Sequence, residues 1–246
     1  MKTIGLIGGM SWESTIPYYR IVNEVVKERL GGLHSAKVVL YSVDFQEMER
    51  LQRVGDWTGA GHVLAQAARS LQLAGADFLV LCTNTMHNIA NTIENAVNIP
   101  LLHIADPTAR EIKRSGINRV GLLGTRFTME QAFYRDRLSD HHGIEVVVPS
   151  ADDRELVHKV IYQELCLGRI INDSRLAYRC VIQRLVDDGA QGIILGCTEI
   201  PMLIGAQDSP VPVFDTTSIH AHSAADWALS EETILPSLVA ATDTAR

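Results

Sequence analysis

The chain has little of what cofactor sites and disulfide frameworks require. Its four cysteines are widely spaced and form no CxxC pair, so neither a zinc site nor a disulfide scaffold is expected. Lysine is scarce and absent from the predicted strand-end turns, which leaves no candidate for a Schiff-base cofactor. Gly8-Gly9 follows the first predicted strand without a full GxGxxG motif, which favours a plain tight turn over dinucleotide binding. These absences disfavour a metal site, a Schiff-base cofactor and a bound dinucleotide.

Long apolar runs and an excess of positive charge are also missing. No segment approaches the roughly 18 apolar residues that span a bilayer, and the first residues carry no signal-peptide cleavage pattern. The formal net charge of −7 gives no support for binding nucleic acid or a membrane surface. Together with the unpaired cysteines, these features predict a cytoplasmic protein with a small-molecule partner, and neither nucleic acid nor membrane as a partner.

One stretch of the sequence occurs twice. Residues 189–199, GAQGIILGCTE, align without a gap with residues 75–85, GADFLVLCTNT, and residues 2–9 resemble residues 118–125. Such self-similarity indicates two related halves, and in each half short apolar strands alternate with helical patterns, as in parallel βαβ units. The predicted fold class is α/β, with two pseudo-symmetric Rossmann-like domains and parallel sheets. One small ligand can lie between the domains if they face each other.

The strand pattern restarts near residue 120, which predicts a domain boundary within residues 106–117. We assign residues 1–106 to an N-terminal α/β domain and residues 107–215 to a C-terminal one. Residues from about 216 to 246, a helix followed by the tail 231–246, are assigned to the first domain for economy of the chain path. Pro17 is expected in the first turn of the first long helix, and Asp106-Pro107 at the cap of a later one.

The two copies of the repeat end in turns that carry candidate reactive side chains. The strand Gly192–Leu195 is followed by Gly196-Cys197-Thr198-Glu199 and then by a helical pattern. Ligands of open α/β sheets bind at such strand ends, where helix amides hold anions and favour a thiolate. A lone cysteine is more often an inert buried residue. The repeat, which aligns Cys197 with Thr83, favours a shared functional site instead.

Four strand-end turns, at residues 8–11, 83–85, 125–128 and 197–199, offer hydroxyl, amide and backbone N–H groups. This composition suits a small substrate with carboxylates and an amino group that Glu199 binds, and it does not suit a large apolar ligand. Three arginines are candidate partners for an acidic side chain: Arg50, Arg53 and Arg126.

Other polar residues have less specific interpretations. His220 and His222 are two residues apart in a predicted helix and do not share a face, so a solvated or capping role is favoured over metal binding. His87 either tunes the site or is a buried, hydrogen-bonded residue. Cys166 and Cys180 lie in predicted helices and are assigned to packing.

The residues in these turns resemble the aspartate/glutamate racemase superfamily. Its two motifs are written CNT[AM]H and GCTE, and this chain has TNTMH at residues 83–87 and GCTE at residues 196–199. The opening MKTIGLIGGMSWEST is similar to the enterobacterial branch, the L-aspartate/glutamate-specific or broad-specificity amino-acid racemases. The resemblance runs through nearly the whole chain, to about residue 229.

This resemblance implies a PLP-independent amino-acid racemase, an isomerase with its active site in the interdomain cleft and commonly a homodimer. One thiolate removes the Cα proton and a group on the opposite face returns one, because inversion needs a base and an acid on opposite sides. Cys197 matches one catalytic cysteine. The binding residues implied are Asn84, Thr85, Thr125 and Thr198, with Glu199, Met10 and Gln52 as further candidates.

The chain departs from the superfamily at its first catalytic cysteine. That position is Thr83, and Cys82 comes one residue earlier, where a strand side chain points to the other face. We therefore hypothesise that Cys197 deprotonates L-aspartate or L-glutamate, or another polar amino acid such as homoserine, faster than the D-enantiomer is deprotonated. Thr83, directly or through a water, then reprotonates the opposite face.

Several other functions stay open. A single thiol also fits a decarboxylase of the arylmalonate type, although the polar turns disfavour an aryl substrate. Hydantoin racemases and maleate isomerases belong to the same superfamily, and the opening MSWES disfavours them. A sensor that binds amino acids without turnover is the alternative outside catalysis. The presence of Cys197, Thr198 and Glu199 speaks against it.

Overall fold

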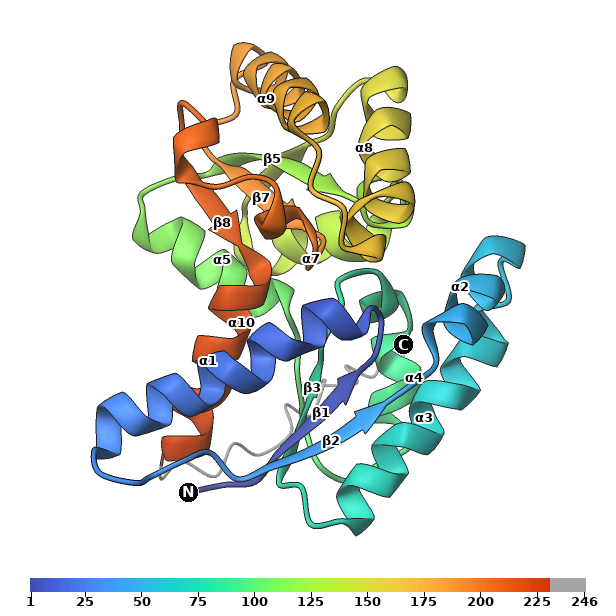
Figure 1. Ribbon diagram of the computed structural model, residues 1–246, viewed down its shortest axis with the longest axis vertical. Coiled ribbons are helices and arrows are strands. Elements are labelled where there is room, and N and C mark those ends of the chain that lie inside the picture. Colours follow the sequence, from blue (N-terminus) through green and yellow to red (C-terminus); the bar gives the residue numbers. More distant parts are fainter. Residues whose placement is uncertain (231–246) are drawn as a thin grey trace, which may run out of the picture.

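A computed structural model describes residues 1–230 of the chain, and these residues form two α/β halves, each built on a four-stranded parallel sheet (Figure 1). The strand order is β2-β1-β3-β4 in the first sheet and β6-β5-β7-β8 in the second. The predicted tail 231–246 lies outside the described residues. Within residues 1–230, no helix combines the length and the apolar character needed to cross a membrane.

The first half contains β1 (Ile4–Gly8), α1 (Trp12–Leu30), β2 (Val38–Ser42), α2 (Phe45–Val54), α3 (Trp57–Leu73), β3 (Phe78–Leu81), the 3₁₀ helix η1 (Thr85–Ile89), α4 (Ala90–Glu94) and β4 (Leu101–Leu102). The second contains α5 (Ala105–Arg114), β5 (Arg119–Gly124), α6 (Arg126–Glu130), α7 (Ala132–His142), β6 (Glu145–Val147), α8 (Ala151–Gln163), η2 (Leu165–Leu167), α9 (Asn172–Asp187), β7 (Ile193–Gly196), η3 (Ile200–Met202), η4 (Ala206–Asp208) and β8 (Val213–Asp215). The last described element is α10 (Thr216–Leu229).

The sequence repeat corresponds to a structural repeat. β3 and β7 hold equivalent places in their sheets, each paired with the first strand of its half: β3 with β1, and β7 with β5. Gly75 and Gly189, which the repeat aligns, both have a positive φ (89° and 94°) where a helix turns into the strand, and glycine adopts that conformation without a steric penalty. The predicted pseudo-symmetric α/β architecture is confirmed.

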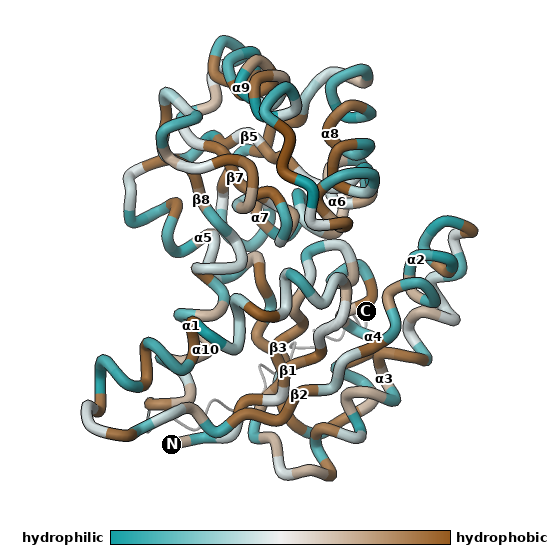
Figure 2. The backbone as a smooth tube through the Cα atoms, in the orientation of Figure 1, coloured by the Kyte–Doolittle hydropathy of each residue, from teal (hydrophilic) through white to brown (hydrophobic). Residues whose placement is uncertain are grey.

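The first sheet is covered by helices on both faces, so β3 is buried along its whole length. Phe78, Val80 and Cys82 point into a core shared with α1 and α10, whereas Leu79 and Leu81 face α3, as the two-residue period of a strand requires. The hydropathy colouring shows the same distribution, with β1 and β3 brown between helices that carry teal segments (Figure 2).

The helix α10 begins at the end of β8 and packs against α1 of the first half (Figure 1). Asp215 caps it, because its side chain accepts hydrogen bonds from the backbone N–H groups of Thr217 and Ser218. The Lys2 backbone N–H donates to the Ala228 carbonyl, so the N-terminal strand is joined to the far end of this helix. The two halves are therefore connected by the crossings before α5 and after β8.

Several expected local features are wrong. Pro17 lies inside α1 and not in its first turn, because the helix already begins at Trp12, directly after the Gly9–Ser11 turn. The N-cap of α5 is Ile104, and Asp106 lies in the first helical turn, where it pairs with Arg137. The expected helices after Thr83 and Cys197 are short 3₁₀ turns at first, η1 and η3.

Candidate active site

The turns that follow β3 and β7 meet at one pocket between the two halves. Parallel strands of an open sheet direct their carboxyl ends to one edge, and here the two edges face each other. The pocket is lined by Met10, Phe45, Gln52, Thr83, Thr85, Thr125, Ile161, Tyr162, Cys166, Cys197, Thr198 and Glu199. Every site residue predicted from the sequence is in this set except Asn84.

Asn84 lies behind the pocket instead of lining it. It is buried, and its Nδ2 donates a 3.0 Å hydrogen bond to Thr216 Oγ1. The Thr216 hydroxyl in turn donates to the Leu195 carbonyl over 2.8 Å. Asn84 therefore joins the turn after β3 to the end of β7, which does not match the expected direct contact with substrate.

The thiol of Cys197 is hydrogen-bonded to a carboxylate. Its Sγ lies 2.9 Å from Glu199 Oε2, which also accepts from the Thr198 hydroxyl over 2.9 Å. Glu199 Oε1 accepts from the hydroxyl of Ser11 at 2.9 Å and from its backbone N–H at 3.3 Å. The donors thus come from both halves of the molecule, and they fix the carboxylate against the thiol.

The expectation that the strand-end position favours a thiolate is wrong for the unliganded site. Burial raises the pKa of the Cys197 thiol well above its usual value, and the negative charge of Glu199 raises it further. The helix that was expected to stabilise the thiolate is only the three-residue η3. Cys197 is consequently a protonated thiol that donates to Glu199.

Thr83 faces the same pocket from the other half. Its backbone N–H donates to the Leu81 carbonyl, and among residues 1–230 its Oγ1 has no hydrogen-bond partner. Cys82 is fully buried on the opposite side of the strand, in the core with Tyr18, and burial raises its thiol pKa. As expected from the register, Cys82 does not reach the pocket.

Hydroxyl and amide groups connect the two halves around the pocket. Thr85 Oγ1 lies 2.9 Å from Thr125 Oγ1 and 3.2 Å from Thr128 Oγ1. The hydroxyl of Tyr162, on α8, donates to Gln52 Oε1 on α2 over 3.0 Å, and its ring stacks on Phe45 with centroids 6.4 Å apart. The pocket walls are therefore polar toward the strand ends and aromatic toward α2 and α8.

The arginines suggested for an acidic side chain do not line the pocket. Arg53 pairs with Glu49 on the surface of α2, and Arg126 pairs with Glu155 at 3.5 Å; Arg50 is exposed. No lysine, arginine or histidine is among the lining residues of this pocket. Its one ionisable carboxylate is Glu199.

Some lining residues were not predicted as site residues. Cys166 packs against the core of the second half, as assigned, and also lines the pocket. Cys180 is exposed on α9, so the packing assignment is wrong for Cys180. Ser11 was visible in the first strand-end turn, but its bond to Glu199 joins residues 188 positions apart. Tyr162 carries no sequence signal, since it lies on a helix without a motif.

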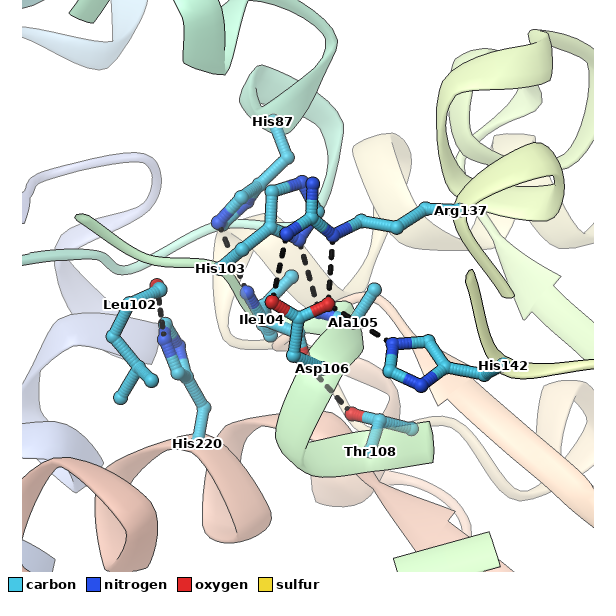
Figure 3. A network of polar contacts seen from close by, with 10 residues as sticks. All are labelled: His87, Leu102, His103, Ile104, Ala105, Asp106, Thr108, Arg137, His142 and His220. Carbon is cyan, nitrogen blue, oxygen red and sulfur yellow. Dashed lines mark hydrogen bonds and ion pairs between the residues drawn. The ribbon is translucent and has the colours of Figure 1, made fainter. Parts of the chain in front are cut away.

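Two of the three histidines considered from the sequence, His87 and His220, are buried and hydrogen-bonded. His220 lies between the Tyr18 hydroxyl and the Leu102 carbonyl, so a solvated or capping role is wrong for it, whereas His222 is exposed. His87 contacts the Thr83 carbonyl and the Ile104 N–H (Figure 3 draws His87, Ile104 and His220). In residues 1–230, no group of three or more potential ligand side chains could hold a metal ion.

Fold and site together define a two-half α/β protein with a polar pocket between facing strand ends. A model of the Asp/Glu/hydantoin racemase family matches residues 7–224. The broad-specificity amino-acid racemase RacX of Bacillus subtilis is 24% identical, over 89% of this chain and 95% of the relative. The chain therefore belongs to the Asp/Glu/hydantoin racemase family and is a racemase, an isomerase.

Solved structures agree with this assignment. A Yersinia pestis protein described as an Asp/Glu racemase candidate is 63% identical, with a TM-score of 0.87 over 94% of this chain and 100% of that one. An aspartate racemase homologue from Pyrococcus horikoshii is 36% identical, with a TM-score of 0.79 over 93% and 99% of the two chains.

Proposed function

We propose that this racemase inverts amino acids without a cofactor, with Cys197 and Thr83 acting on opposite faces of the substrate Cα. One observation supports this most directly: the two side chains come from opposite halves and line the same pocket. A carbon acid is inverted when one group removes its proton and another donates a proton to the opposite face. A substrate lying between the two strand ends would satisfy this requirement.

Glu199 is the proposed acceptor for the Cys197 proton. A thiol must lose its proton before it can act as a base, and the carboxylate already accepts that hydrogen bond at 2.9 Å. When the proton moves to Glu199, the thiolate no longer faces a negative charge. The bonds from Ser11 and Thr198 hold the carboxylate in place during this transfer.

Hydroxyl groups are the proposed partners of the substrate carboxylate. Loss of the Cα proton places negative charge on that carboxylate, and fixed donors stabilise such charge in a water-poor site. Thr85, Thr125 and Thr198 line the pocket with hydroxyls close to the two reactive side chains. We assign them this role, with Met10 and Gln52 completing the wall.

The pocket chemistry bears on the choice among aspartate, glutamate and homoserine. An acidic side chain needs a cationic or amide-rich partner, and among the lining residues only Gln52 offers an amide and none offers a cation. The negative charge of Glu199 further disfavours a second carboxylate. The site therefore supports an uncharged polar substrate such as homoserine over L-aspartate and L-glutamate.

The two directions of the reaction are expected to differ in proton exchange. Enantiomers have equal free energies, so the racemisation equilibrium favours neither, and the asymmetry between the two reactive groups is kinetic. The thiol of Cys197 serves as a base more readily than the hydroxyl of Thr83. We therefore expect faster Cα exchange from the L-enantiomer.

Proton NMR in D₂O tests this function on the purified protein. The Cα signals of L- and D-homoserine, aspartate and glutamate are followed, with Cys197→Ser as the control. Cα exchange that requires Cys197 and is faster from the L-side supports the proposal. Binding of these amino acids without exchange would instead identify a sensor.

The assembly and domain division are part of the same proposal. We assign residues 1–106 and α10 to one domain, because α10 shares the core of the first sheet, and residues 107–215 to the other. Trp12, Ile16 and Tyr19 lie on one face of α1 and are 61%, 54% and 57% exposed, a stripe that supports a homodimer. Sedimentation equilibrium measures the oligomeric state.

A further inference from the structure

The hydrogen bonds of His87 determine which of its ring nitrogens carries the proton. The Ile104 backbone N–H points at Nε2 over 3.2 Å (Figure 3), and a backbone N–H only donates. Nε2 is therefore the acceptor, and the proton of the neutral ring is on Nδ1. That N–H donates to the Thr83 carbonyl over 2.7 Å.

The His87 ring stays neutral over the pH range in which most enzymes work. Burial, and to a smaller extent the neighbouring His220, lower the pKa of His87 to about 3. His87 thus has no role as a titrating acid or base near neutral pH. It is a fixed donor on one side and a fixed acceptor on the other.

The two residues that the His87 ring contacts, Thr83 and Ile104, lie in different parts of the molecule. Ile104 is the N-cap of α5, and in the first turn of that helix Asp106 accepts two 2.7 Å hydrogen bonds from Arg137 on α7 (Figure 3). His142 also contacts Asp106, at 3.2 Å. The carbonyl of Thr83 is thereby connected through His87 to a helix that is anchored in the second half.

Few polar contacts act on Thr83 itself. Its hydroxyl faces the pocket without a partner among the described residues, and its backbone N–H is bonded only within its own turn, to the Leu81 carbonyl. Its neighbours are anchored, Cys82 in the core and Asn84 by its hydrogen bond to Thr216. The Nδ1–H bond from His87 is the contact made to the Thr83 carbonyl, so together with these anchors it sets where the Thr83 hydroxyl lies relative to Cys197.

We propose that His87 is a positioning residue for the racemisation reaction, which holds the Thr83 backbone so that the hydroxyl meets Cα opposite Cys197. This inference rests on the proposed function. It predicts that a change at His87 impairs proton delivery from the Thr83 side more than proton removal by Cys197.

The informative measurement is a ratio, because a general structural defect lowers both steps together. In D₂O, an L-substrate can return as deuterated L-enantiomer, which needs only the Cys197 side, or as D-enantiomer, which also needs Thr83. The ratio of exchange with retention to inversion is obtained by NMR and chiral chromatography on the same sample. A displaced Thr83 raises this ratio.

Two substitutions separate the two hydrogen bonds of the ring. In His87→Asn, Nδ2 takes the place of Nδ1 and keeps the donor to Thr83. In His87→Gln, Oε1 reaches the place of Nε2 and keeps the acceptor for Ile104. We expect the ratio to rise about tenfold in His87→Gln, the effect of one buried hydrogen bond, and to stay near the wild-type value in His87→Asn.

Equal ratios in wild type and His87→Gln would overturn the inference while leaving the proposed function intact. No exchange in the wild-type protein would overturn the proposed function, and the inference with it. If neither variant folds, ¹⁵N NMR of the wild-type imidazole decides: a proton on Nδ1 of His87 supports the inference, and a proton on Nε2 contradicts it.

Discussion

The turns after β3 and β7 occupy equivalent places in the two sheets, yet they differ in the residue before the reactive side chain. In the first turn, Cys82 fills the core next to Tyr18. In the second, the equivalent residue is Gly196, where a Cβ would lie 2.7 Å from Leu122 Cδ1 and 2.9 Å from the Leu123 carbonyl. The two halves therefore share a backbone arrangement and differ in how tightly the neighbouring strands approach it.

The turns also differ in their acid–base environment. The carboxylate of Glu199 contacts Cys197, whereas Thr85, which the repeat aligns with Glu199, offers a hydroxyl that bonds to Thr125 and Thr128. Among the described residues, no carboxylate is hydrogen-bonded to the Thr83 hydroxyl. The two halves thus share the arrangement of strands and turns, but only the second turn places a carboxylate against its reactive side chain.

Removal of the thiol gives the largest expected effect. Cys197→Ser keeps the size of the side chain but loses a group that ionises far more easily than a hydroxyl, so Cα exchange from the L-substrate falls at least about 100-fold. The measurement is NMR in D₂O. Cys180→Ser, on the exposed face of α9, is the matched control and retains wild-type exchange. An equal loss of Cα exchange in both variants would contradict the assignment of Cys197 as the base.

A second thiol is expected to reduce the asymmetry between the turns. Thr83→Cys places a more acidic group at the aligned position, so exchange from the D-enantiomer rises about tenfold while exchange from the L-enantiomer changes less. Thr83→Val, which has the same shape without the hydroxyl, lowers the rate at which the L-enantiomer is converted into the D-enantiomer. If Thr83→Val racemises as fast as wild type, Thr83 takes no part in proton delivery.

Neutralisation of Glu199 gives the smallest expected effect, seen in the pH dependence of thiol reactivity. Because the charge of Glu199 raises the pKa of Cys197, Glu199→Gln lowers it, and the pH profile of Cys197 alkylation by iodoacetamide moves to lower pH. Racemisation nevertheless slows, since the proton acceptor is lost. The control Glu155→Gln, on the surface, leaves the profile unchanged. An unshifted profile in Glu199→Gln would contradict the proposed pairing of the Cys197 thiol with the Glu199 carboxylate.

The sequence determined the strands, the repeat and the two turns, because these depend on local hydrophobic patterns and on short motifs. The repeat placed Thr83 opposite Cys197, and the two-residue period of β3 correctly directed Cys82 into the core. Apart from Asn84, the predicted site residues line the pocket. The strands and turns depend on residues that are close in the chain, the repeat on a comparison of two segments of the sequence, and most of the binding residues on the resemblance to the racemase superfamily.

Only the tertiary structure decided the state and the surroundings of the reactive groups. Burial and the charge of Glu199 raise the pKa of the Cys197 thiol, and Ser11 donates to Glu199 from the opposite half of the molecule. The Asn84 amide donates to the Thr216 hydroxyl, and the Tyr162 hydroxyl donates to Gln52. A pKa and a hydrogen-bond partner depend on desolvation and on contacts between distant segments, and these quantities exist only once the chain has folded.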